Sequence, residues 1–288
     1  MPSEPSLPAL AKAGSSVAQF YFKSRRLAHF GALGVALVTL FVPEFFAYGL
    51  AVVALLIEAL AWWLRYKGEH YHRLSRELIR WARLENAFGK LRESALYITD
   101  LRHSFGGKLE QKAMQLDQKF YNEDGYYTSD KSQGNVRFLE NLQESAFWSK
   151  HLYAIAAQRT FGLVGLASLA VIVIVFFIAP FIASVTPASS WELLLTPKLA
   201  MIFWALVISD ELGSALAWQG AAAGSDEVDR HLDKIRASDQ PSQEILLAVL
   251  GNYSVATAAA PPIPTHIYES QRTHLNKLWD QRMGRSST

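Results

Sequence analysis

Two long apolar tracts, residues 27–64 and 161–223, constrain this chain more than any other feature. A helix that crosses a bilayer needs roughly 20 apolar residues, so each tract is long enough for two crossings. Pro43 and Glu44 interrupt the first tract, and residues 186–198 interrupt the second. Proline breaks a helix, and a charge beside it favours a turn at the membrane surface. The pattern predicts an all-α integral membrane protein with four transmembrane helices in two hairpins.

The tracts divide the chain into five segments. Residues 1–22 contain three prolines and lack the long apolar core of a secretory signal, which predicts a disordered leader. The segments that follow are transmembrane hairpin 1 (23–64, with spans of about 27–42 and 45–64), a cytoplasmic helical domain (65–159), transmembrane hairpin 2 (160–223, with spans of about 161–185 and 199–223) and a cytoplasmic helical tail (224–288).

The distribution of Lys and Arg predicts the orientation. The turn at Pro43 has no base, and the 186–198 connection has only Lys198, whereas the segment 65–159 holds 16. Bases close to span ends favour the cytoplasmic side. We therefore expect a multi-pass protein with the middle segment and both termini in the cytoplasm.

Composition argues against several functions. The chain has no cysteine, which removes disulfides, thiolate metal sites and cysteine nucleophiles. Its formal net charge of +2 does not indicate binding of DNA or RNA. His70 and His72 are two positions apart and so do not share a helical face, which argues against a metal site. No catalytic motif is evident, so we expect neither an enzyme nor a cofactor.

The segment after the first tract has an amphipathic pattern that predicts a long helix ending at Gly106. Its apolar residues recur at steps of three and four and form one stripe. The stripe includes Leu74, Leu78, Trp81, Phe88 and Leu91. Such a stripe packs either against a neighbouring helix of the same chain or against a second subunit.

Other patterns predict further helices. A helix over 136–158 should run into the third span without a break, and residues 258–264 should be extended because three of them are proline. The remaining predicted helices cover 108–120, 226–238, a stretch that begins at Gln243, and about 266–282.

Three acids inside the predicted spans are candidate functional residues. Glu58 lies deep in the second span, and Asp210 and Glu211 lie near the middle of the fourth. A carboxylate at the centre of a bilayer costs about 2.5–3.5 kcal/mol and normally faces a bundle interior or a water-filled cavity. The acids therefore indicate a pore lining or a proton path, or else a buried structural pair with Ser209 and Gln219 as partners.

A second candidate is one face of the helix before the third span. Arg137, Asn141, Glu144 and Trp148 recur at steps of three and four and share that face. A guanidinium group beside an aromatic surface suits a base that carries phosphate. The face is therefore a candidate ligand-binding site, and an internal network that braces the helix is the alternative.

Several motifs resemble one family. The chain carries YYT at 126–128, RFLENLQESAFW at 137–148 shortly before a predicted span, and PPIP at 261–264. With the two pairs of spans, these motifs resemble the SMODS-associated four-transmembrane effectors over nearly the whole chain from about residue 20.

The resemblance implies a bacterial anti-phage role in the cell inner membrane. Such proteins are regarded as pore-forming effectors, encoded beside nucleotidyltransferases that make cyclic oligonucleotide signals. We therefore expect a homo-oligomer in the lipid bilayer that a cyclic nucleotide opens, which causes membrane disruption and cell death. The residues also fit a small ion- or proton-coupled transporter, or a membrane-anchored helical scaffold that gathers partners through the apolar stripe.

Overall fold

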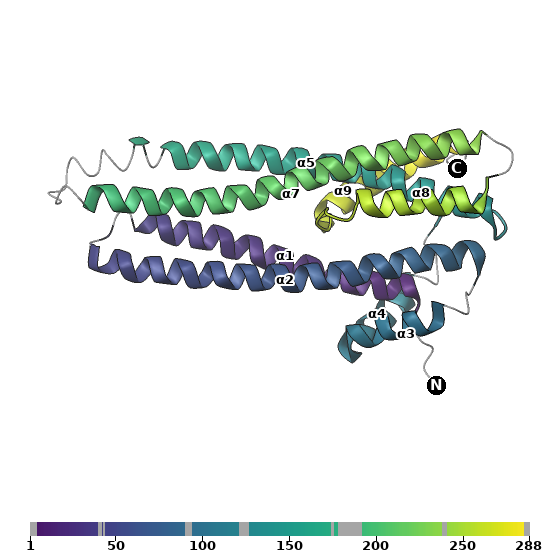
Figure 1. Cartoon of the computed structure of the whole chain (residues 1–288), viewed down its shortest axis with the longest axis horizontal. Coiled ribbons are helices and arrows are strands. Elements are labelled where there is room, and N and C mark those ends of the chain that lie inside the picture. The colour runs from purple at the N-terminus through teal and green to yellow at the C-terminus, as the bar shows by residue number, and fades with distance from the viewer. Residues whose placement is uncertain are drawn as a thin grey trace. The chain divides into compact units, whose positions relative to one another are not determined.

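The computed structural model describes residues 5–39, 42, 44–89, 94–120, 127–173, 176–177, 192–237 and 241–284. This part of the chain contains eight α-helices and no strand, which confirms the all-α prediction (Figure 1). The helices are α1 (Leu7–Val38), α2 (Glu44–Phe88), α3 (Ser94–Phe105), α4 (Gly107–Phe120), α5 (Asn135–Val173), α7 (Glu192–Arg236), α8 (Gln243–Ala256) and α9 (Thr265–Arg282).

The chain forms two compact units. Unit 1 comprises Met1–Gln19, Gly68–Ala156 and Ala217–Thr288, and unit 2 comprises Phe20–Lys67 and Ala157–Leu216. The long helices α1, α2, α5 and α7 each contribute one part to each unit.

Unit 2 has a core that includes close contacts of alanine, and it has an apolar surface. Ala32, Ala36 and Ala54 pack with Val171 and Val207, and alanine lets helices approach closely. Most of the large exposed apolar side chains among the described residues also belong to this unit. A surface of this kind is unusual for a protein in water, where large apolar patches mark interaction sites or contact with lipid.

Two helices, α2 from Phe45 onward and α5, are long and apolar enough to cross a membrane. In each helix only 22% of the most apolar stretch is buried within the chain, so most of that stretch faces outward. The predicted third span extends past Val173 and the first past Thr39, into residues that the structure does not describe. The number of spans and their topology therefore remain predictions.

Exposed aromatic side chains lie at both ends of the apolar part of α2. Phe45, Phe46 and Tyr48 lie at its start, and Trp62 and Tyr66 lie near its end. At 1.5 Å per residue the centres of these two groups are separated by about 27 Å, which is close to the hydrocarbon thickness of a bilayer. Paired aromatic belts are typical of spanning segments.

The first core of unit 1 includes the start of the chain, so the prediction of a disordered leader was wrong. The helix α1 begins at Leu7, and Leu7 and Leu10 are buried against α2, α3 and α4 through Leu78 and Leu109. The prolines do not prevent this helix, because Pro8 lies in its first turn, where no intrahelical N–H bond is lost.

The apolar stripe of α2 packs within the chain. Leu78 is fully buried in the first core and Leu74 lies against it, while Phe88 contacts the second core, with its ring 5.1 Å from that of Phe138. Trp81 touches both cores. Leu91 lies outside the described residues. Of the two interpretations of the stripe, these contacts support packing against neighbouring helices of the same chain.

Two predicted boundaries were wrong. The helix expected to reach Gly106 ends at Phe88, because Gly89 adopts a φ of 82°, which favours glycine and terminates the helix. The residues from Ser94 form the separate helix α3. The helix α7 begins at Glu192, inside the connection predicted over 186–198.

Other predictions of local structure are confirmed. The helix α5 continues from Asn135 to Val173 without a break, α8 begins at Gln243, and α9 covers Thr265–Arg282. Residues 260–264 between α8 and α9 are not helical, but residues 257–259 form a turn, so the segment predicted to be extended over 258–264 begins two residues later.

Candidate functional site: a charged cluster in unit 2

The three acids predicted from the sequence lie together in unit 2. Glu58 comes from α2, and Asp210 and Glu211 come from α7. Their side chains retain 11%, 14% and 6% of their exposure, so all three are removed from the surface. Each is within ion-pair distance of at least one basic or imidazole group of α1. We call these residues, with Arg25, Arg26, His29 and Arg65, the charged cluster.

Glu211 forms the best-defined pair of the charged cluster. Arg26 Nε donates to Oε1 at 2.7 Å, and Arg26 Nη2 donates to Oε2 at 2.8 Å. This two-pronged geometry matches the planar guanidinium group to the planar carboxylate and is the strongest form of a charge-assisted hydrogen bond. The pair joins α1 to α7.

Asp210 has three neighbours in the charged cluster. It forms a close ion pair with Arg25, and its Oδ1 accepts a hydrogen bond from Arg65 Nη1 at 3.1 Å. Its Oδ2 lies 3.3 Å from Nε2 of His29. Asp210 therefore links α7 to both α1 and α2.

His29 lies between two acids. Its Nδ1 is 2.9 Å from Glu58 Oε2, and its Nε2 is near both Asp210 and Arg25 Nε, the latter at 3.3 Å. A neutral ring can donate from Nδ1 to Glu58 while Nε2 accepts from Arg25. A protonated ring would instead donate to both acids. The site can therefore exist in two hydrogen-bonding states that differ by one proton.

The charged cluster is stable only while its members remain paired. Breaking a buried ion pair by removing one partner costs about 3–5 kcal/mol, because the other charge is left without compensation. Separation of α7 from α1 in unit 2 would leave the carboxylate of Glu211, whose side chain is 6% exposed, in that condition unless water reached it, whereas the Arg26 side chain is already 37% exposed. The arrangement can thus couple a movement of helices to hydration of their contact.

Sequence reasoning found the acids and missed their partners. Arg25, Arg26 and His29 were not identified as candidates. A signal was present, because Arg25 and His29 are four residues apart and share one face at the start of the first predicted span. Asp210 and Glu211 diverge as adjacent helical residues must, yet each meets a base of α1.

The predicted ligand-binding face lies in unit 1, where its polar groups bind other parts of the chain. Asn86 Oδ1 accepts hydrogen bonds from Arg137 Nε at 2.9 Å and from Asn141 Nδ2 at 2.8 Å. Asn141 is fully buried. Arg137 and Asn141 are therefore linked through Asn86 of α2. The spacing of the two residues alone did not indicate this contact.

The other two residues of this face contact the tail and a loop. Glu144 accepts from the N–H of Thr128 at 3.1 Å and from its hydroxyl at 2.9 Å. The Trp148 ring lies 5.6 Å from that of Tyr268 in α9. The contacts of all four residues support the internal bracing network rather than an open ligand site.

A second ionic network of unit 1 holds the C-terminal helix. Asp229, which is 1% exposed, pairs with Lys150 at 2.6 Å and with Arg282 of α9 at 2.9 Å. Arg282 also pairs with Asp233. Burial lowers the pKa of Arg282, but hydrogen bonds to both aspartates outweigh it, and the net pKa is raised. The network links α5, α7 and α9.

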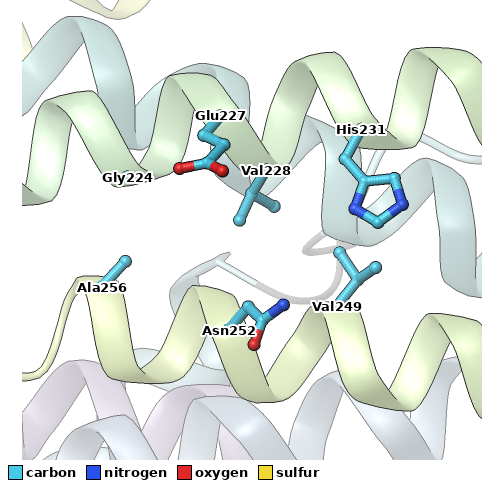
Figure 2. Close-up of a pocket in the computed structure, with 7 residues that line it drawn as sticks. All are labelled: Gly224, Glu227, Val228, His231, Val249, Asn252 and Ala256. Atoms are coloured by element: carbon cyan, nitrogen blue, oxygen red, sulfur yellow. The ribbon is translucent and has the colours of Figure 1, made fainter.

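Unit 1 also has a small cavity between α7 and α8, with a volume of about 150 Å³. Figure 2 shows Glu227 and His231 of α7 on one side and Asn252 of α8 on the other. All three side chains are exposed, so the cavity is a shallow surface hollow. Among the described residues no group of three or more His, Asp or Glu side chains could hold a metal ion.

Comparisons of the chain with protein-family models, with curated proteins and with solved structures gave no match.

Proposed function

We propose that the chain is a pore-forming membrane protein with four spanning helices, and that the charged cluster keeps it closed at rest. The apolar surface of unit 2 and the aromatic belts of α2 support insertion into a bilayer. The observation that carries the proposal is the cluster itself, in which three acids inside an apolar unit are neutralised by residues of α1 and α2.

In this proposal the charged cluster lies at the cytoplasmic end of the spans. Arg25 and Arg26 directly precede the apolar tract that begins at residue 27, and Asp210 and Glu211 pair with them. The fourth span then corresponds to residues 192–209 rather than 199–223. A helix of that length measures about 27 Å, which is close to the thickness of the hydrocarbon core.

Opening requires that α7 separate from α1 near the cluster. The freed charges would be hydrated by incoming water, and a hydrated path lined with charges conducts ions. Because α2, α5 and α7 run from unit 1 into unit 2, a ligand that binds unit 1 could favour the open state. It would shift the balance only by its difference in affinity for the two states.

The biological role that we propose follows from the family resemblance. The protein is a homo-oligomeric effector of a bacterial anti-phage system, located in the inner membrane with both termini in the cytoplasm. A cyclic nucleotide from a cognate nucleotidyltransferase acts as the signal, and opening kills the infected cell. The exact contacts of that signal are not those of Arg137, Asn141 and Glu144, which already bind within the chain.

The test is a measurement of ion leakage from liposomes that contain the purified protein. Glu211→Gln removes one charge of the pair with Arg26, and we expect leakage to rise at least tenfold without any ligand. The double variant Arg26→Met, Glu211→Leu replaces both charges by apolar groups, which is often neutral or stabilising, and should restore low leakage. A Glu211→Gln protein that is folded, inserted and as tight as the wild type would contradict the proposal.

A second candidate, a proton-coupled carrier, is favoured by the position of His29 between Glu58 and Asp210. The same variant separates the two functions, because they predict opposite changes. Loss of a carboxylate from a carrier abolishes saturable flux, whereas loss of a carboxylate from a closed pore increases leakage.

A further inference from the structure

The cytoplasmic end of unit 2 carries more bases than the charged cluster uses. Arg25, Arg26 and Arg65 contact Asp210 or Glu211. Three further bases, Lys23, Lys67 and Arg159, form no ion pair with any other residue that the structure describes. Lys23 and Arg159 are exposed and Lys67 is partly exposed.

The three bases come from three different helices, and each lies within four residues of the end of an apolar tract in the sequence. Lys23 of α1 precedes the first tract, Lys67 of α2 follows it, and Arg159 of α5 precedes the second. Close in the sequence to Lys23 and Lys67, the exposed Trp63 of α2 contacts the partly exposed Tyr21 of α1 edge to face, with ring centroids 6.3 Å apart. Cationic groups bordering an aromatic belt match the headgroup region of a bilayer in both charge and polarity.

We propose that Lys23, Lys67 and Arg159 bind the headgroups of anionic phospholipids at the cytoplasmic surface of the membrane. The proposal rests on the membrane insertion proposed above and adds a lipid preference to it. Two observations select the occupant: the three unused positive charges, and their continuity with the exposed apolar surface of unit 2, which acyl chains would cover.

Lipid bound at these bases would also affect the charged cluster. The Arg65 side chain is 50% exposed and reaches Asp210 at 3.1 Å, so it borders both the cluster and the headgroup region. Neutralisation of Lys67 and Lys23 by phosphate would reduce the excess positive charge beside Arg65 and Arg26. Anionic lipid should therefore stabilise the folded unit.

The experiment compares phosphatidylglycerol with phosphatidylcholine as additives to the full-length protein in micelles of an uncharged detergent. Each basic side chain near an anionic surface contributes about fivefold to lipid affinity. We expect phosphatidylglycerol to raise the thermal unfolding midpoint more than phosphatidylcholine does. The triple variant Lys23→Gln, Lys67→Gln, Arg159→Gln should lose this preference, and added salt should weaken it in the wild type.

A matched triple variant, Lys234→Gln, Arg272→Gln, Lys277→Gln, makes the same change of charge on exposed bases of unit 1 and should keep the preference. Equal midpoints with the two lipids, or equal loss of preference in both triple variants, would overturn the proposal. If glycerol phosphate stabilised the protein as strongly as the lipid does, the bases would bind a soluble phosphate rather than a lipid headgroup. That result would overturn the proposal as well. A protein that stays soluble without detergent would instead contradict membrane insertion.

Discussion

Single side chains decide how the end of α8 is held in unit 1. Arg76 Nη1 donates to the carbonyl oxygen of Thr257 at 2.9 Å, and His72 Nε2 lies 3.1 Å from the carbonyl oxygen of Ala260. Burial, and then the charge of Arg76, lowers the pKa of His72 to about 4. His72 is therefore neutral at pH 7 and donates a hydrogen bond to Ala260.

This lowered pKa predicts a loss of stability in acid. Between pH 6.5 and about 4 the unfolded chain binds a proton at His72 and the folded chain does not, so the free energy of unfolding falls by at most about 3 kcal/mol. His72→Gln keeps a donor for Ala260 but cannot be protonated. Its stability should fall less than that of the wild type over this range, measured by thermal unfolding in detergent at pH 7 and pH 4. Parallel changes in the two proteins would show that His72 does not contribute.

At the scale of elements, the contact between α7 and α8 depends on one glycine. A Cβ atom added at Gly224 would lie 2.6 Å from the Cβ of Ala256, which is closer than van der Waals contact permits. The two helices can therefore approach closely only because this position has no side chain. The second core of unit 1, which includes Val228 and Val249, is assembled beside this contact.

Gly224→Ala should consequently destabilise unit 1 by about 1–3 kcal/mol, because the helices must separate to admit a methyl group. Gly220→Ala on the same helix is the control, since nothing lies within 4 Å of its added Cβ. Alanine there should be neutral or stabilise the helix by up to about 1 kcal/mol. The measurement is the midpoint of thermal unfolding, which should be lower for Gly224→Ala than for Gly220→Ala. Equal midpoints would contradict the packing argument.

At the scale of the whole molecule, the two units share four long helices but differ in the side chains that they expose to their surroundings. Unit 2 exposes most of the large apolar side chains on the surface of the described residues, whereas unit 1 has two apolar cores and several polar networks. This division is the one that a bilayer on one part of a helix and water on the other would require.

The absence of cysteine makes the predicted topology directly testable with single introduced cysteines. Glu44→Cys lies in the predicted external turn and Lys277→Cys in the predicted cytoplasmic tail. In spheroplasts a membrane-impermeant maleimide should label the first variant in intact cells and the second only after lysis. Labelling of Lys277→Cys from outside would contradict the proposed orientation and, with it, the cytoplasmic position of the charged cluster.

The helices could be predicted where the signal was local. The continuous apolar and amphipathic pattern of α5 and the proline segment before α9 are read directly from residue spacing, because each helix or break is specified by its own residues. The end of α2 at Gly89 was missed, since the apolar stripe continues beyond it and a single glycine does not always end a helix. The helical start of the chain was missed for the opposite reason: its prolines suggested disorder, although they lie at and before the first turn.

The candidate site was also predictable only in part. The three acids stood out from the sequence alone, because a carboxylate is conspicuous within an apolar tract. Which base neutralises each acid was decided only by the tertiary structure, since Arg26 and Glu211 are far apart in the chain and meet through the packing of α1 against α7. Periodicity and composition report the environment that each segment requires. The pairing of distant charges depends on helix register and rotation, which local sequence does not encode.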